Sequence, residues 1–275
     1  MDTVVLGFDG REAAFIALDW VARRAAQVPS TVEFLTVGDA LTDPMTRELS
    51  LQEAEQRIRK QANSAVITSR QVAGTMPHAL VESSIDADLL VIGARRQRLL
   101  GSLLDGWLPL RLVAHSPIPT VIVPCDADDN STGPVIVGVD DDDSSQAAIE
   151  FGAREATARG LSLLLIHVWR MPDPESNGAG AYLATPKGVL NMHRQVLREA
   201  GQRATTLGSE LSVTETLVHD NPVSALLSAA RNASLLVLGT HHRGLIEGAF
   251  LGSVAQDIIP QTPIPVCVAP TPSAR

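Results

Sequence analysis

Short apolar runs alternate with longer amphipathic segments along the chain. Runs such as VVLGFD at residues 4–9 and LLVLG at residues 235–239 are closed by acidic residues or glycine. Runs of this length and composition are typical of strands that are buried on both faces of a parallel sheet. Strands that alternate with helical segments predict an α/β fold, in which helices cover both faces of a parallel sheet.

The whole pattern occurs twice. VVLGFD, from Val4 to Asp9, recurs as VIVGVD, from Val135 to Asp140, at an offset of 131 residues (140 − 9). Later elements match at an offset of 146 (239 − 93), so the second copy carries about fifteen additional residues, which the segment RMPDPESNGAGAYLATPKG accommodates. We expect strands at residues 3–8, 31–37, 66–72, 89–92, 119–123, 134–139, 162–168, 212–218, 235–238 and 265–269. We expect helices at residues 12–27, 46–62, 77–85, 107–115, 144–159, 187–207, 222–231 and 252–260.

A polar, acidic and turn-rich segment, CDADDNSTGP at residues 125–134, lies between the copies. It reads as a short linker, and 275 residues suffice for two α/β domains with their own cores. We therefore expect two tandem domains, residues 1–130 and 131–275, each with an open five-stranded parallel sheet. Because the linker is short, the two domains should pack against each other.

Composition narrows the function classes. A net charge of −9 and a pI near 5.2 argue against a nucleic-acid partner, since binding to phosphate backbones draws on clustered Lys and Arg. No run approaches the roughly 18 to 20 apolar residues of a membrane span. The N-terminal segment leads directly into a strand-like run without a basic region or cleavage site, which predicts a cytoplasmic protein.

Candidate chemistry follows the buried run at residues 235–238. Gly239 ends this run, and Gly252-Ser253-Val254 opens the next helical segment. Backbone N–H groups and a hydroxyl at a helix N-terminus favour an anion such as phosphate, and glycine lets the anion approach the backbone. The alternative is that Gly239 simply ends a strand and Ser253 simply caps a helix.

The spacing of these residues resembles the nucleotide-binding signature of the universal stress protein family, G-x-x-G-(nine residues)-G-[ST]. Gly239 takes the first glycine, Gly252 the third and Ser253 the Ser/Thr position; His242 replaces the second glycine. This departure affects the closest approach to the phosphates, although the ring of His242 could donate to a phosphate oxygen. The phosphate side of the expected site comprises Gly239, Thr240, His241, His242, Arg243, Gly252, Ser253 and Val254.

The resemblance covers both copies and implies a tandem universal stress protein. It implies a Rossmann-like sheet in each half, with ATP or another adenine nucleotide as ligand. By the same resemblance, Asp140, preceded by Val139, lies near the adenosine, and the backbone of Val168 contacts adenine. Trp169 could close over this pocket, or Val168 and Trp169 could be ordinary packing at a strand end.

The acidic run Asp140–Asp143 has two interpretations. Carboxylates before a helix are usually solvated and suit its N-terminus. Beside a triphosphate they would repel the ligand unless a divalent cation such as Mg²⁺ lies between.

The first copy lacks parts of the signature. Aligned at Gly93, it places Arg96 at the second glycine and Trp107 at the Ser/Thr position. An indole there removes the hydroxyl and would occupy the space of a phosphate, so we expect one nucleotide per chain, in the second copy.

Catalytic motifs such as G-x-x-x-x-G-K-[ST], G-x-S-x-G and H-E-x-x-H do not occur in the sequence. This favours a nucleotide-dependent regulatory module of the stress response, acting on an unidentified protein partner. Two alternatives stay open: a slow ATPase or other nucleotide-dependent enzyme that uses a divalent cation, and an interaction scaffold that binds no nucleotide.

The resemblance also implies how the halves associate. In the family the fifth, edge strand commonly pairs with its counterpart in a second domain, which hides exposed backbone donors. We therefore predict that residues 120–123 and 266–269 lie side by side about a pseudo-two-fold axis within one chain. Further homodimerisation of the chain is left open.

Overall fold

The computed structural model describes residues 1–38, 44–95, 107–127, 132–171, 186–208, 210–240 and 251–271. The N-terminal half contains β1 (Asp2–Gly7), α1 (Glu12–Gln27), β2 (Ser30–Val37), α2 (Pro44–Gln61), β3 (Val66–Val72), α3 (His78–Ser83), β4 (Leu89–Ala94), α4 (Leu108–His115) and β5 (Thr120–Pro124). The C-terminal half contains β6 (Val135–Val139), α5 (Ser144–Ala158), β7 (Leu163–Trp169), α6 (Pro186–Leu207), β8 (Val213–His219), α7 (Pro222–Ala230), β9 (Leu235–Thr240), α8 (Ser253–Ile258) and β10 (Val266–Pro270). Every expected strand and helix is present, with ends that shift by at most two residues.

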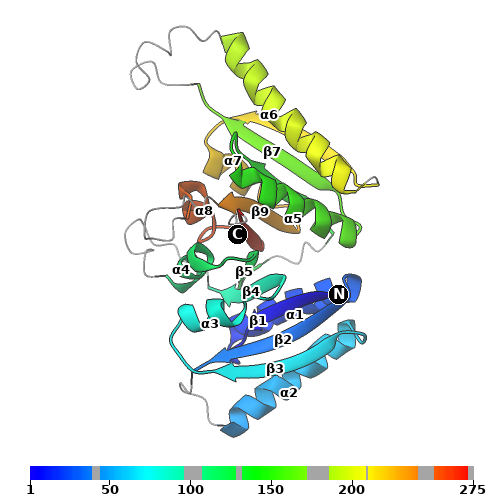
Figure 1. The fold of residues 1–275 in the computed structure, drawn as a ribbon, viewed down its shortest axis with the longest axis vertical. Helices are drawn as coiled ribbons and strands as arrows, with labels where there is room; N and C mark the ends of the chain where they lie inside the picture. Colours follow the sequence, from blue (N-terminus) through cyan, green and yellow to red (C-terminus); the bar gives the residue numbers. More distant parts are fainter. Residues whose placement is uncertain are drawn as a thin grey trace.

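The two five-stranded sheets are joined into one ten-stranded sheet. Its strand order is β3-β2-β1-β4-β5-β10-β9-β6-β7-β8, and the strands within each half are parallel. The N-terminal half therefore lies at one end of the molecule and the C-terminal half at the other, with α2 and α6 farthest apart (Figure 1).

The junction between the halves is the antiparallel pair of β5 and β10. Val121 lies opposite Cys267, and the flanking partners are Ile122 with Val266 and Thr120 with Val268. Val121 and Cys267 are equivalent residues of the two copies, so the pseudo-two-fold axis passes between them. The predicted pairing of the two edge strands is confirmed.

Helices cover both faces of the sheet, as expected. One buried cluster joins the sheet to α1, α2, α5 and α6, and the other joins it to α3, α4, α7 and α8. Alternation along a strand divides its side chains between these clusters: Val135, Val137 and Val139 of β6 belong to the first, and Ile136 belongs to the second. Both clusters contain residues of both halves, so the halves share their cores.

Within the described ranges, no helix has the length and apolar character that crossing a membrane requires. The segment expected to hold the additional residues of the second copy lies largely outside these ranges.

Candidate functional site

A cavity of about 360 Å³ opens at the carboxyl ends of β6, β7 and β9. In the sheet, β7 lies on one side of β6 and β9 on the other, so β6 is the point at which the strand order reverses. Parallel α/β sheets bind ligands at such a switch point, because the two loops that leave neighbouring strands diverge to opposite faces and leave a crevice. The volume lies within the range of small-molecule sites.

The structure brings the described candidate residues together around this cavity. Those that line it are Val139, Asp140, Val168, Gly239, Thr240, Gly252, Ser253 and Val254. His241, His242 and Arg243 lie outside the described residues. Strands β6, β7 and β9 thus supply one wall, and the start of α8 supplies the facing wall.

Sequence reasoning missed several residues that complete the lining. Ser144 and Ser145 enter from the first turn of α5, and Pro222 and Leu226 enter from α7. The two serines follow directly after the acidic run, at the start of a predicted helix, and only this position could have indicated that they line the cavity. The contribution of α7 could not be read from spacing, since it depends on how that helix packs.

The two signature glycines differ in what surrounds them. A Cβ built on Gly239 would lie 2.1 Å from the carbonyl oxygen of Ser144, so close packing between β9 and α5 requires a glycine here whatever the ligand. Around Gly252, by contrast, a built Cβ meets no described atom within 4 Å. Gly252 has φ −58° and ψ 146°, a conformation open to any residue. Neither contacts with the described residues nor backbone conformation therefore explains the glycine at position 252.

Hydroxyl groups hold the turn that carries Asp140. The backbone N–H of Asp140 donates to Ser145 Oγ at 2.7 Å, and this hydroxyl donates to the carbonyl oxygen of Asp140 at 3.2 Å. Asp142 Oδ1 accepts from the backbone N–H of Ser144 at 2.9 Å and from its hydroxyl at 2.6 Å. The backbone of Asp140 is therefore fixed before any ligand arrives.

Three carboxylates gather at the mouth of the cavity. One oxygen from each of Asp140, Asp141 and Asp142 lies within 4.8 Å of the others. The side chain of Asp140 is exposed as a whole, but neighbouring atoms partly desolvate its carboxyl and so raise its pKa, and the charges of Asp142 and Asp141 add to this effect. These oxygens are the hard donors that Mg²⁺ prefers.

A histidine pair supports the cavity from behind. The buried ring of His167 contacts the carbonyl oxygen of Val139 through Nδ1 at 2.7 Å, and its Nε2 lies 2.8 Å from His193 Nδ1. A carbonyl can only accept, so His167 Nδ1 carries a proton, and in the neutral ring Nε2 accepts from His193. Burial and the neighbouring His167 lower the pKa of His193. The pair thus anchors a strand end that lines the cavity.

Trp169 does not take the place suggested for it. Its ring stacks on His193, with 5.1 Å between centroids, and contacts His219, with 4.5 Å between centroids. Side chains alternate along β7, so Val168 faces the cavity while His167 and Trp169 lie on the other face of the strand. Trp169 is an edge residue of the histidine cluster, and it is not among the described residues that line the cavity.

A second cavity, of about 390 Å³, occupies the equivalent place in the N-terminal half. Asp9, Val37 and Gly93, the counterparts of Asp140, Val168 and Gly239, line it. Trp107 packs against the core, and it is Leu108, the first residue of α4, that contributes to the cavity wall. The indole therefore removes a hydroxyl, as expected, but it does not fill the cavity.

Tandem doubly wound domains, each with a cavity at its switch point, define a protein of the Rossmann-like α/β class. The family model "Universal stress protein family" matches residues 1–124 and 132–270. The chain belongs to the universal stress protein family.

Individual relatives and solved structures are similar to this chain. The chain is 27% identical over 288 residues to Universal stress protein Rv2005c of Mycobacterium tuberculosis, and the match covers 97% of this chain and 96% of the relative. A universal stress protein from Archaeoglobus fulgidus DSM 4304 superimposes with a TM-score of 0.68 at 20% identity, covering 98% of each chain, which supports the fold. A shorter universal stress protein from Archaeoglobus fulgidus, solved in complex with dAMP, covers 50% of this chain and 98% of its own, with 23% identity and a TM-score of 0.38.

Proposed function

We propose that the C-terminal cavity binds an adenine nucleotide, ATP in the first instance, and that the chain is a nucleotide-dependent regulatory module of the stress response. One observation carries the proposal. Gly252, in the cavity wall at the switch point, is a glycine that neither contacts with the described residues nor backbone conformation explains. A ligand that needs the space beside its Cα supplies the missing reason, because any side chain would fill that space.

The surrounding residues suit the parts of such a ligand. The hydroxyl of Ser253, exposed at the start of α8, is available to a phosphate oxygen, together with the backbone N–H groups of that turn. Val168 and Leu226 offer apolar contacts to a base. Asp140, whose backbone Ser145 holds in place, lies where the adenosine would rest.

A divalent cation would have a defined place in this arrangement. Asp140, Asp141 and Asp142 would hold Mg²⁺ between the protein and the phosphates, which would also relieve the repulsion among these carboxylates. The same three carboxylates favour slow nucleotide hydrolysis as a second candidate function. Steady phosphate release from ATP that depends on Mg²⁺ and is lost in Ser253→Ala would identify the hydrolase; ATP that stays intact on the protein would identify the binding module.

The main test is the stoichiometry of nucleotide on the full chain. Native mass spectrometry and titration calorimetry with ATP should give one nucleotide per chain, and Gly252→Val should abolish it by filling the open space. Met76→Trp is the matched control, because Met76 lines only the N-terminal cavity and is partly exposed. ATP binding that survives Gly252→Val and disappears in Met76→Trp would show that the nucleotide lies in the other half.

A further inference from the structure

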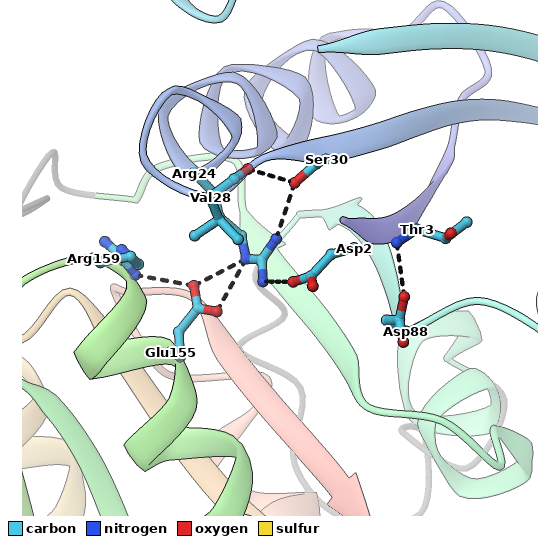
Figure 2. A network of polar contacts seen from close by, with 8 residues as sticks. All are labelled: Asp2, Thr3, Arg24, Val28, Ser30, Asp88, Glu155 and Arg159. Atoms are coloured by element: carbon cyan, nitrogen blue, oxygen red, sulfur yellow. Dashed lines mark hydrogen bonds and ion pairs between the residues drawn. The ribbon is translucent and has the colours of Figure 1, made fainter. Parts of the chain in front are cut away.

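A buried ion pair crosses the junction between the two halves. Arg24 of α1 donates from Nε to both carboxylate oxygens of Glu155 of α5, at 3.1 and 3.0 Å. The side chains of Arg24 and Glu155 are only 6% and 2% exposed. Figure 2 shows the guanidinium of Arg24 held between Glu155 on one side and Asp2 and Ser30 on the other. This charge-assisted pair therefore joins the first helix of each half and is deeply buried.

Arg24 and Glu155 occupy the same position in the two copies. They are separated by 131 residues, which is the offset that relates β1 to β6. Across a two-fold axis between identical halves, a residue beside the axis meets its own copy. Two N-terminal halves joined through β5 would thus place Arg24 against Arg24, and two C-terminal halves would place Glu155 against Glu155. The two copies therefore carry opposite charges at this buried position.

The strands at the junction do not distinguish a pair of like halves from a pair of unlike halves. Main-chain pairing at a sheet edge accepts any strand of suitable length, and the central partners, Val121 and Cys267, are both small and apolar. On the N-terminal side, the neighbours of the pair leave this distinction in place. Asp2 binds the Nη2 edge of Arg24 at 2.7 Å, so the Nε edge of two facing arginines would have no acceptor between them. Arg159 lies 3.6 Å from Glu155 Oε1, on the C-terminal side of the contact only.

We propose that Arg24 and Glu155 select the partner of each half: an N-terminal half pairs only with a half that carries an acidic side chain at the position of Glu155. The chain therefore joins its own two unlike halves. A second copy of the chain can enter this interface only by exchanging unlike halves. Specificity of this kind rests on the repulsive contact that the wrong pairing would create.

Two single charge reversals in the full chain test the proposal. Arg24→Glu and Glu155→Arg each place like charges across the axis of their own chain. We expect the equilibrium between paired and separated halves to shift by on the order of 100-fold or more in each, since breaking a buried pair leaves an uncompensated charge. Mixed, unfolded and refolded together, the two variants can exchange halves, which restores one Arg24–Glu155 contact and creates one reversed contact. Native mass spectrometry should then find a 1:1 heterodimer in the mixture and no corresponding dimer of either variant alone.

The control is an ion pair away from the junction. Arg203 and Glu150 lie 3.7 Å apart and are 43% and 45% exposed, so Arg203→Glu and Glu150→Arg should behave as wild type and should not complement each other. The double variant Arg24→Leu/Glu155→Leu should fold and should lose less stability than either reversal, because no like charges face each other across the junction. Single reversals with wild-type stability would overturn the proposal. So would destabilised reversals that form no heterodimer on mixing, because the pair would then contribute stability without selecting a partner.

Discussion

The residues after the first strand differ in kind between the two halves. After β6, the hydroxyl of Ser145 bonds both backbone groups of Asp140. After β1, Ala14 stands in place of Ser145, and the turn is held by the backbone N–H of Arg11, which donates to Asp9 Oδ1 at 3.0 Å. The fold thus supplies a cavity of similar size to each half, while the first helical turn supplies its chemistry.

Charge separates the two cavities further. Arg11 and Arg47 line the N-terminal cavity, and carboxylates gather at the mouth of the C-terminal one. At the start of the last helix of each half, Ser253 lines the C-terminal cavity, whereas its counterpart Trp107 packs into the core. Duplication has therefore preserved the crevice and changed the groups that face a ligand.

The largest expected effect is on stability, and it concerns a closely packed glycine that both halves share. A Cβ on Gly93 would lie 1.8 Å from the carbonyl oxygen of Ala13, and one on Gly239 would lie 2.1 Å from that of Ser144. We expect Gly93→Ala and Gly239→Ala each to lower the free energy of unfolding by on the order of 3 kcal/mol, measured by urea denaturation. Gly252→Ala should change it by no more than about 0.5 kcal/mol. A harmless Gly239→Ala would mean that β9 and α5 pack less closely than described here.

The next effect separates Ser253 from its counterpart. If Ser253 donates to a phosphate, Ser253→Ala should weaken ATP binding roughly ten- to a hundred-fold, the value of a hydrogen bond to a charged group. Trp107→Ala should leave ATP affinity unchanged and lower the stability of the fold by about 2 kcal/mol, because the indole is a partly buried core contact. Calorimetry and urea denaturation of both variants give the comparison. Weaker ATP binding in Trp107→Ala would show that the N-terminal half takes part.

A smaller effect is expected at the turn after β6. Ser145→Ala removes the acceptor of the Asp140 backbone N–H and should lower the free energy of unfolding by about 1 kcal/mol. The fixed backbone of Asp140 would loosen, so ATP affinity should fall as well. Ser224→Ala, in α7, is the control, since position 224 does not line the cavity. Unchanged stability and ATP affinity in Ser145→Ala would show that this hydroxyl does not support the C-terminal cavity.

The smallest expected effect is a pH dependence confined to the C-terminal half. Thr36 Oγ1 donates to the carbonyl oxygen of Phe8 at 3.0 Å, whereas its counterpart His167 makes the same contact with a ring that also bonds His193. Burial and His167 lower the folded-state pKa of His193 below the ordinary value of 6.5, so the unfolded state binds more protons below that pH. The contribution of His193 to the free energy of unfolding should therefore be fully present above pH 6.5 and should decrease as the pH falls below this value.

Urea denaturation at several pH values between 8 and 5 measures how steeply the free energy of unfolding changes with pH. His193→Gln keeps a donor for His167 and removes the titrating group, so its slope in this range should be shallower than that of wild type. Equal slopes would show that another group governs the acid response.

Periodicity and the internal repeat were sufficient to predict the elements of the fold, and the resemblance to the universal stress protein family predicted the strand pair at the junction. The resemblance also named the eight described residues that line the cavity, and those of β6, β7 and β9 meet there because the carboxyl ends of neighbouring parallel strands lie together. The packing reason for Gly239 was not predictable, since it depends on how closely α5 approaches β9. The position of Trp169 depended on the direction in which a strand-end side chain turns. Arg24 was equally hidden, because an arginine in an amphipathic helix is usually solvated, and only the meeting of the two halves buries it.

The antiparallel junction of β5 and β10 also sets the direction in which each cavity faces. All strands of one half run opposite to those of the other, so their carboxyl ends, and the two cavity mouths, lie at opposite borders of the continuous sheet. A compact protein bound at one border could contact the cavity there and could not reach the other cavity across the width of the sheet. A protein that bound at one border would therefore lie next to one cavity and not the other.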